Sequence, residues 1–196
     1  MFCGSEDDVL DRYYQVLRIL RPEHVVRITA DCPLIDPQVI DRAVRLHLSS
    51  GADYTSNAVV RSYPEGQDVE VMRSAALERA WRSARWSSER EHVTSYIWKR
   101  PRSFRIQNMA LARNLSRCRW TLDEPADLRF LRAVFAALHA RDHLFGMEAV
   151  LRLLKRRPGL AALNGYVPQH AGYRKSLAED RLAGRLAPLA IAAIRR

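Results

Sequence analysis

Residues 25–37 carry the strongest structural signal in this chain and read Val25-Val26-Arg27-Ile28-Thr29-Ala30-Asp31-Cys32-Pro33-Leu34-Ile35-Asp36-Pro37. The first part is a short apolar run that predicts a buried strand, and a carboxylate, two prolines and a second acid follow it. Open α/β sheets bind ligands outside the carboxyl ends of their strands, which makes Asp31 the first candidate functional residue. An Asp between a strand and a proline is also common in a plain turn, and this stretch alone leaves both readings open.

The segments on either side of this stretch predict helices. Apolar residues recur at helical spacing over about 6–20, and Pro22 ends that pattern. A second helix is predicted over about 39–48, ended by Ser49-Ser50-Gly51. Helices joined to strands by short links are typical of α/β folds, so the sequence predicts that class.

The rest of the chain continues this alternation. Strands are predicted near 52–57, 67–72, 104–108 and 118–122, and Asp123 closes the last of them as Asp31 closes the first. Helices are predicted over 75–85, from Pro125 onward and over 147–156. Residues 91–98 fit either a helix or a strand, and the helix is favoured because Pro101 ends it.

Composition places the chain among globular proteins. A length of 196 residues and an apolar fraction of 47% predict a single domain with one sizeable core. No apolar run approaches the length of a membrane span, and the acidic start is unlike a signal peptide, which predicts a cytoplasmic protein. Three widely separated cysteines argue against a disulfide framework or a zinc knuckle.

The net charge of +10 raises the alternative of a basic module that binds nucleic acid or an anionic surface. Its densest basic cluster runs from Lys99 to Arg105, beside Trp98. Only three of the 32 basic residues are lysines, however, and the arginines are spread over the whole length rather than gathered in one patch. This spread argues against nucleic acid as a partner.

Five ordered blocks of sequence now resemble the cytidylyltransferase family that activates acidic sugars. The resemblance is greatest to its branch of spore-coat polysaccharide biosynthesis and acylneuraminate cytidylyltransferase-like proteins. It covers about residues 3–135, with a weaker echo at 172–177. The blocks are Gly4 to Tyr13, Val26 to Pro37, Tyr63 to Gly66 with Asp68 to Glu70, Arg90 to Thr94, and Thr121 to Leu128.

The resemblance implies a nucleotide-diphosphosugar-transferase fold, a three-layer α/β/α sandwich over a mixed sheet. One domain would span residues 1–196, with the sheet and site in about 1–135 and a helical part in about 136–196. The implied reaction is attack of a sugar hydroxyl on the α-phosphate of CTP, which gives a CMP-sugar and pyrophosphate. A nucleotide-sugar-dependent glycosyltransferase is the near alternative, because fold alone does not fix function.

The resemblance also implies roles for five residues. Asp31 and Asp123 match metal-binding catalytic acids, which suits Mg²⁺ because that ion takes one or two protein carboxylates together with phosphate oxygens. Arg90, His92 and Glu70 would lie on the sugar side. The plainer readings are a solvated charge run over 89–91 and a solvent-facing Glu70.

One part of the family pattern is missing from this chain. Family members open with a strand and a basic, glycine-containing loop that holds the nucleotide, and this sequence contains no such loop. We therefore expect an N-terminally truncated domain, inactive and weak in nucleotide binding on its own. The strand at 25–29 would then form a bare sheet edge, through which the chain could form homo-oligomers.

Overall fold

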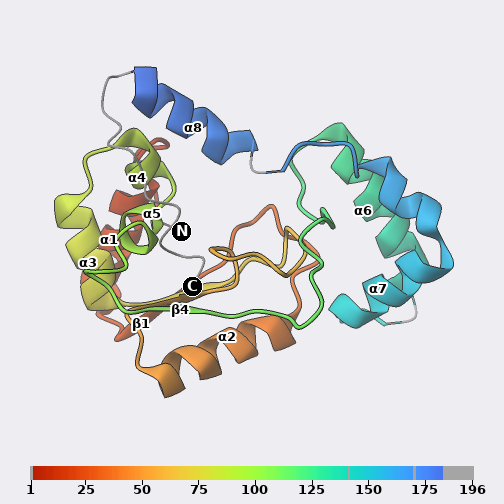
Figure 1. Cartoon of the computed structure of the whole chain (residues 1–196), viewed down its shortest axis with the longest axis horizontal. Coiled ribbons are helices and arrows are strands. Elements are labelled where there is room, and N and C mark those ends of the chain that lie inside the picture. The colour runs from red at the N-terminus through yellow and green to blue at the C-terminus, as the bar shows by residue number, and fades with distance from the viewer. Residues whose placement is uncertain (1, 141, 170, 183–196) are drawn as a thin grey trace.

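A computed structural model describes residues 2–140, 142–169 and 171–182. Helices and strands alternate over the first two thirds of these residues, and helices follow (Figure 1). Their order is α1 Val9–Leu20, β1 His24–Arg27, α2 Pro37–Ser50, β2 Tyr54–Ser56, β3 Glu70–Arg73, α3 Ser74–Ser83, α4 Ser87–Glu91, α5 Ser95–Trp98, β4 Ile106–Asn108, α6 Pro125–Leu138, α7 Met147–Arg156, the 3-10 helix η1 Pro158–Leu163, and α8 Ala171–Leu182.

The strands form one mixed sheet in the order β1-β3-β2-β4. β3 is antiparallel to both of its neighbours, whereas β2 and β4 run parallel. β1 therefore lies at one edge of the sheet. β1 is only half-buried, with 41% of Val26 exposed, so the expectation of a strand buried on both faces is wrong. The expectation that this strand lies at an edge of the sheet is confirmed among the described residues.

Helices cover both faces of the sheet, which makes three layers. Successive residues of a strand point to opposite faces. Val71 of β3 packs with Val39 and Ala43 of α2, whereas Met72 packs with Leu10 of α1 and with α3. The predicted α/β/α architecture with a mixed sheet is therefore confirmed.

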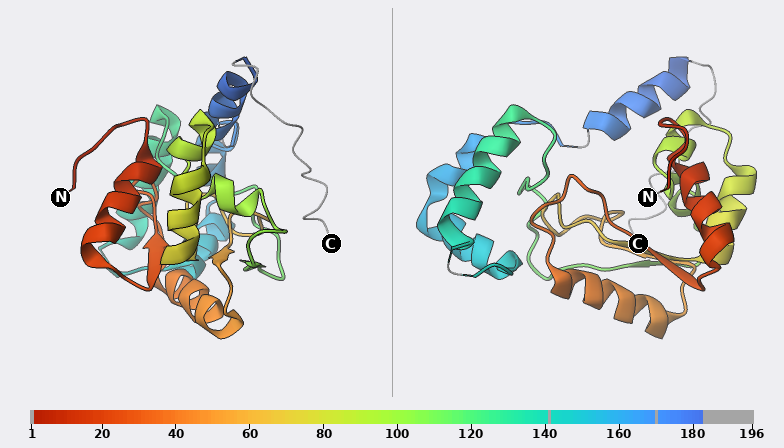
Figure 2. Two further views of the ribbon diagram at one scale, coloured as in Figure 1. Left: turned by 90° about the vertical axis from the view of Figure 1, so that its left-hand side faces the viewer. Right: turned by 180° about the vertical axis from the view of Figure 1, so that it is seen from behind.

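α6 and α7 extend the core on the α2 side, beyond the end of the sheet (Figure 1). From there η1 and the segment after it lead to α8, which crosses back to pack on α4 (Figure 2). The chain thus returns to the first helices before residue 182. Within the described residues, no helix combines the length and the apolar character that a membrane crossing requires.

Two predicted elements differ from the structure. The predicted strand at 118–122 is absent, because its backbone pairs first with Glu65 and then with Asp31, and neither partner continues into a ladder. The predicted helix over 91–98 is broken into α4 and α5. Val93 causes the break, since its φ of 55° lies in the left-handed region that a β-branched residue rarely adopts.

Candidate functional site

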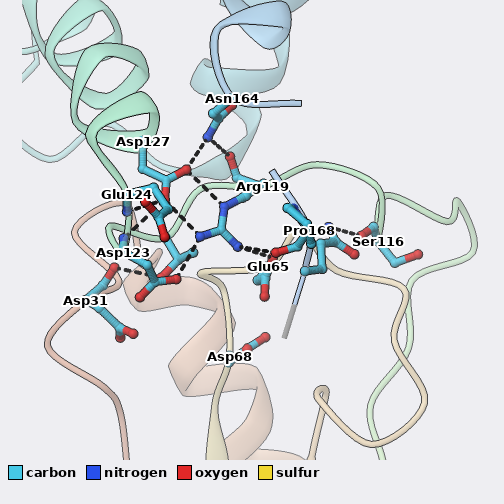
Figure 3. A network of polar contacts seen from close by, with 12 residues as sticks. Asp31, Glu65, Asp68, Ser116, Arg119, Asp123, Glu124, Asp127, Asn164 and Pro168 are labelled. Atoms are coloured by element: carbon cyan, nitrogen blue, oxygen red, sulfur yellow. Dashed lines mark hydrogen bonds and ion pairs between the residues drawn. The ribbon is translucent and has the colours of Figure 1, made fainter. Parts of the chain in front are cut away.

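Asp31 and Asp123, predicted from distant parts of the sequence, are brought together by backbone hydrogen bonds. The Asp31 carbonyl accepts from the Leu122 amide at 2.9 Å and from the Thr121 hydroxyl at 3.2 Å. Asp31 leaves the sheet just after β1, and Asp123 lies just before α6. Figure 3 shows both carboxylates on the same side of Arg119.

A tight turn holds the Asp123 segment against the rest of the site. Glu65 donates its amide to Cys118 and accepts from the Trp120 amide. Gly66 follows with a φ of 97°, and a Cβ there would lie 2.7 Å from the Trp120 carbonyl carbon. Glycine is therefore required at this position, both by its conformation and by the close approach of the two backbones.

Arg119 is the centre of the polar network beside the two acids (Figure 3). Its Nε and Nη2 donate to Asp127 at 2.9 and 2.8 Å, Nη2 also donates to Asp123 at 2.8 Å, and Nη1 donates to Glu65 at 3.1 Å. Charge-assisted bonds of this kind are the strongest that side chains make. Their electrostatic gain raises the pKa of Arg119 despite its burial, so the guanidinium stays charged.

Asp127 also holds the Asp123 segment in place. Its Oδ2 accepts from the amides of Asp123 and Glu124, and its Oδ1 accepts from Asn164. Burial alone would raise its pKa, but these bonds and those from Arg119 lower the pKa of Asp127 to about 2. Asp127 is therefore a fully ionised structural anion at neutral pH.

Two further carboxylates lie at or just before the start of β3, and Asp68 is the one influenced by the charge of Asp31. Asp68 accepts two parallel bonds from Arg61, each 2.9 Å long, and its pKa is raised by burial and by the charges of Glu70 and Asp31. Glu70 is fully enclosed and accepts bonds from Arg27, from the Tyr54 hydroxyl and from the Thr94 hydroxyl. Burial opposes its ionisation, but these partners hold the pKa of Glu70 below its ordinary value.

The contacts of Glu70 decide between the readings left open by the sequence. The carboxylate does not face solvent, because only 6% of the residue is exposed, so that reading is wrong. Its oxygens are engaged by β1, β2 and the loop after α4. Contact between Glu70 and a sugar stays a prediction.

Arg90 lies in α4 and uses all three guanidinium nitrogens within the protein. Nε and Nη2 donate to Asp8, and Nη1 donates to the Trp81 carbonyl. The neighbouring Glu89 is buried and pairs with Arg100 at 2.8 Å, so the expected solvated run over 89–91 is wrong. Binding of a sugar by Arg90 stays a prediction.

His92 lies in the loop between α4 and α5, beneath α8. Its Nε2 is 2.9 Å from the Ser176 hydroxyl, and Tyr173 packs edge-on against its ring. Burial lowers the pKa of His92, which favours the neutral imidazole. The strained Val93 follows directly, and strained backbone of this kind gathers at functional sites.

The donor set at Asp31 and Asp123 suits Mg²⁺ bound together with a phosphate. Both ligands are carboxylate oxygens, and 49% of the Asp123 side chain is exposed. No group of three His, Cys, Asp or Glu side chains within the described ranges is placed to enclose a metal by itself. Mg²⁺ commonly takes one or two carboxylates and completes its shell with phosphate and water, so the residues fit that ion.

Sequence reasoning found the two acids but missed Arg119 and Asn164. In the sequence, Arg119 lies four residues before Asp123 and eight before Asp127. This spacing indicates an ion-pair network only once the two acids are known to flank the start of a helix. Asn164 left no such signal, because it reaches the site from a distant segment.

Three comparisons with known proteins bear on this site. A family model described as cytidylyltransferase matches residues 1–143. The chain is 32% identical over 179 residues to the uncharacterized protein MJ1063 of Methanocaldococcus jannaschii, covering 89% of this chain and 70% of that protein. It is 30% identical over 164 residues to the spore coat polysaccharide biosynthesis protein SpsF of Bacillus subtilis, covering 82% and 67%.

The fold also matches a solved structure of a cytidylyltransferase from Leptospira borgpetersenii with a TM-score of 0.76 and 26% identity. That match covers 81% of this chain and 66% of the other. The chain therefore spans about two thirds of the length of the proteins that it resembles.

Proposed function

The chain belongs to the cytidylyltransferase family, and from that premise we propose that its site transfers a cytidylyl group from CTP to an acidic sugar in the biosynthesis of a surface polysaccharide. The sugar hydroxyl attacks the α-phosphorus of CTP, the bond to the β-phosphate breaks, and pyrophosphate leaves. SpsF is named for such a biosynthetic process, which supports the glycan as the destination.

The convergence of Asp31 and Asp123 is the observation that carries this proposal. Two segments ninety residues apart are joined by hydrogen bonds to the Asp31 carbonyl, and each segment carries one of the two acids. These two acids would hold Mg²⁺. When bound, the ion would neutralise charge that develops on the phosphates, which is most of what this class of reaction asks of a protein.

The other residues of the site hold the acids and border the sugar side. Arg119 and Asp127 restrain the Asp123 segment through its side chain and its amide. Glu70 fixes the Thr94 hydroxyl directly after the His92 loop, and this loop is the sugar-facing candidate. His92, neutral at physiological pH, could accept a proton or a hydrogen bond from a sugar hydroxyl.

The structure gives the basic-module alternative little support. The densest basic cluster is largely engaged within the chain: Arg100 pairs with Glu89 and stacks on Tyr96, and Lys99 lies over the rings of Trp98 and Tyr173. We propose a cytoplasmic location, which the free state of all three cysteines supports.

The test is pyrophosphate release from CTP with Mg²⁺ and a panel of acidic sugars. It is run on the 196-residue chain and on the full-length product of its gene. We expect Asp31→Asn and Asp123→Asn each to lower the rate by at least about a hundredfold, since each would remove a charged ligand of the Mg²⁺ that neutralises the reacting phosphates.

Glu78→Gln is the matched control, because Glu78 is a surface carboxylate of α3 that pairs only with Arg82 one helical turn away. Its rate should stay within about twofold of the wild-type rate, as for surface substitutions in general. Full activity in Asp31→Asn would contradict the proposed site. Release from UTP or ATP rather than CTP would contradict the proposed nucleotide.

A further inference from the structure

Arg119 is a single buried cation shared among three carboxylates. Only 4% of its side chain is exposed, and its guanidinium bonds Asp127, Glu65 and Asp123. Glu65 and Asp127 are buried, whereas Asp123 is the one partner that reaches solvent. These three carboxylates gather around Arg119, and Asp123 lies beside Asp31 (Figure 3).

Asp123 contacts this cluster through one oxygen. Arg119 binds its Oδ2, and the Asp123 amide is held by Asp127. Within the described ranges, Oδ1 of Asp123 accepts no hydrogen bond. The carboxylate is thus fixed in orientation while half of it stays available to a ligand near Asp31.

We propose that Arg119 is a positioning residue for the divalent cation that Asp31 and Asp123 hold, an inference that rests on the proposed function. Arg119 does not touch the cation or the substrate. It keeps the free oxygen of Asp123 aimed toward Asp31 and prevents the three carboxylates from repelling one another apart. Metal sites commonly depend on such outer partners, whose loss weakens metal affinity about 10- to 100-fold.

Residues of the C-terminal segment hold Arg119 and its neighbours in place through hydrogen bonds. The Asn164 side chain donates to the Arg119 carbonyl at 3.0 Å and to Asp127 at 2.9 Å, and Gln169 donates to the Ser116 carbonyl. Asn164 therefore binds both members of the Arg119–Asp127 pair without contacting Asp31 or Asp123. Its replacement should loosen the cation site from a distance.

The geometry also requires arginine rather than lysine at position 119. Asp127 takes two parallel bonds from Nε and Nη2, and a third nitrogen serves Glu65. An ammonium group is a point charge and cannot bridge these acceptors in one plane. Arg119→Lys keeps the charge but loses the fork that orients Asp123.

The experiment measures the binding of Mn²⁺, as a paramagnetic substitute for Mg²⁺, by the electron paramagnetic resonance of the free ion, first alone and then with CTP. Wild type is compared with Arg119→Lys, Asn164→Ala and the control Arg100→Lys. Arg100 forms an equally short ion pair with the buried Glu89, so it matches the loss of stability without contacting the acids. Thermal unfolding of each variant verifies that it is folded.

We expect Arg119→Lys to weaken Mn²⁺ binding about tenfold and Asn164→Ala about threefold, whereas Arg100→Lys stays within about twofold of wild type. Unchanged Mn²⁺ affinity in both Arg119→Lys and Asn164→Ala would overturn the proposal. If Arg119→Lys fails to fold, Asn164→Ala decides the question alone.

Measuring Mn²⁺ binding both without and with CTP distinguishes a failure of this proposal from a failure of the proposed function. A wild type that binds Mn²⁺ but shows no CTP-dependent gain would contradict cytidylyl transfer and leave the variants to decide the role of Arg119. A wild type that binds no Mn²⁺ in either condition would overturn both, since Arg119 would then have no cation site to position.

Discussion

His47 is an ionisable side chain enclosed between α2 and β2. Its Nε2 is 3.1 Å from Nδ1 of His24, and its Nδ1 is 3.0 Å from the Thr55 hydroxyl. Burial and the neighbouring His24 lower its pKa to about 4. The imidazole ring of His47 is therefore neutral in the folded protein at neutral pH. In the unfolded chain, His47 has the ordinary pKa of a histidine.

The free energy of unfolding should depend on pH through this residue. Between about pH 6.5 and pH 4 the unfolded chain binds the proton and the folded chain does not, so stability falls as the pH falls through that window. The loss should approach about 3 kcal/mol at pH 4 relative to pH 7. Urea unfolding at several pH values measures it.

The variant His47→Gln isolates this contribution. It should be less stable than wild type at pH 7, because the fit to His24 and Thr55 is lost. Its stability should fall less steeply between pH 6.5 and pH 4, since the titrating group is gone. Equal slopes in the two proteins would show that other groups set the pH dependence.

At the level of single residues, the sequence predicted which acids lie at element ends but not what each side chain binds. Asp31 follows β1 as the strand pattern predicted, whereas the strand that Asp123 was expected to close is absent and Asp123 instead precedes α6. The partner of Asp8 was not predictable. Arg12 lies one helical turn from Asp8 in the sequence, yet Asp8 pairs with Arg90, which is 82 residues away. Such pairings depend on tertiary packing, which local spacing does not encode.

Among the turns, the one that ends at Gly66 has the most stringent requirement. Replacing Gly66 by alanine would force a residue with a Cβ into φ 97° and place that carbon 2.7–2.9 Å from the Trp120 and Thr121 backbone. We expect Gly66→Ala to lower the free energy of unfolding by about 2–4 kcal/mol. Urea denaturation compares it with wild type.

Gly159 provides the matched control for this substitution. An added Cβ at Gly159 meets nothing within 4 Å, and its φ is not in the left-handed region. Gly159→Ala should therefore change stability by less than about 0.5 kcal/mol. Similar losses in both variants would mean that the Gly66 turn tolerates a side chain.

Whole elements were predicted well where a long periodic pattern existed and poorly where the chain is short and irregular. α1, α2, α6 and α7 lie close to their predicted ranges. β3 begins at Glu70 rather than 67, because the Asn57 side chain, instead of a strand, bonds the Gln67 carbonyl and the Val69 amide. The alternation of polar and apolar residues in the sequence does not show where a side chain, rather than a neighbouring strand, satisfies the backbone.

For the molecule as a whole, the open edge at β1 has consequences for association. Val26 and Ile28 are exposed on it, and Ile19, Leu20 and Phe2 are exposed nearby. Of these side chains, Val26, Ile28, Leu20 and Phe2 border a groove of about 570 Å³ between α1 and β1. No second strand pairs with β1 within the described residues, and an apolar edge of this kind is a template for pairing with another strand.

We expect the chain to self-associate through this edge. Sedimentation over about a hundredfold range of concentration should show mass rising with concentration in wild type and not in Val26→Lys, because a charge on an edge strand blocks pairing. Leu144→Lys is the control, since Leu144 is 83% exposed and lies between α6 and α7. A wild type that stays monomeric throughout would contradict this expectation.

The layered architecture was predictable because it follows from alternating elements and the family resemblance, whereas the path of the C-terminal part was not. No periodic signal places Asn164 on the Arg119 network or Ser176 on His92. The Asn164–Asp127 contact spans 37 residues and the Ser176–His92 contact spans 84, so local spacing predicts neither.

That returning path also sets the order in which the protein can mature on the ribosome. Domains form progressively from the N-terminus as the chain is synthesised. Asp31 and Asp123 emerge well before Asn164, so the Arg119–Asp127 pair that holds the Asp123 segment gains the bonds from Asn164 only late in synthesis. A nascent chain stalled near residue 160 would hold the sheet and both acids while lacking these bonds, and would be a ready substrate for chaperones.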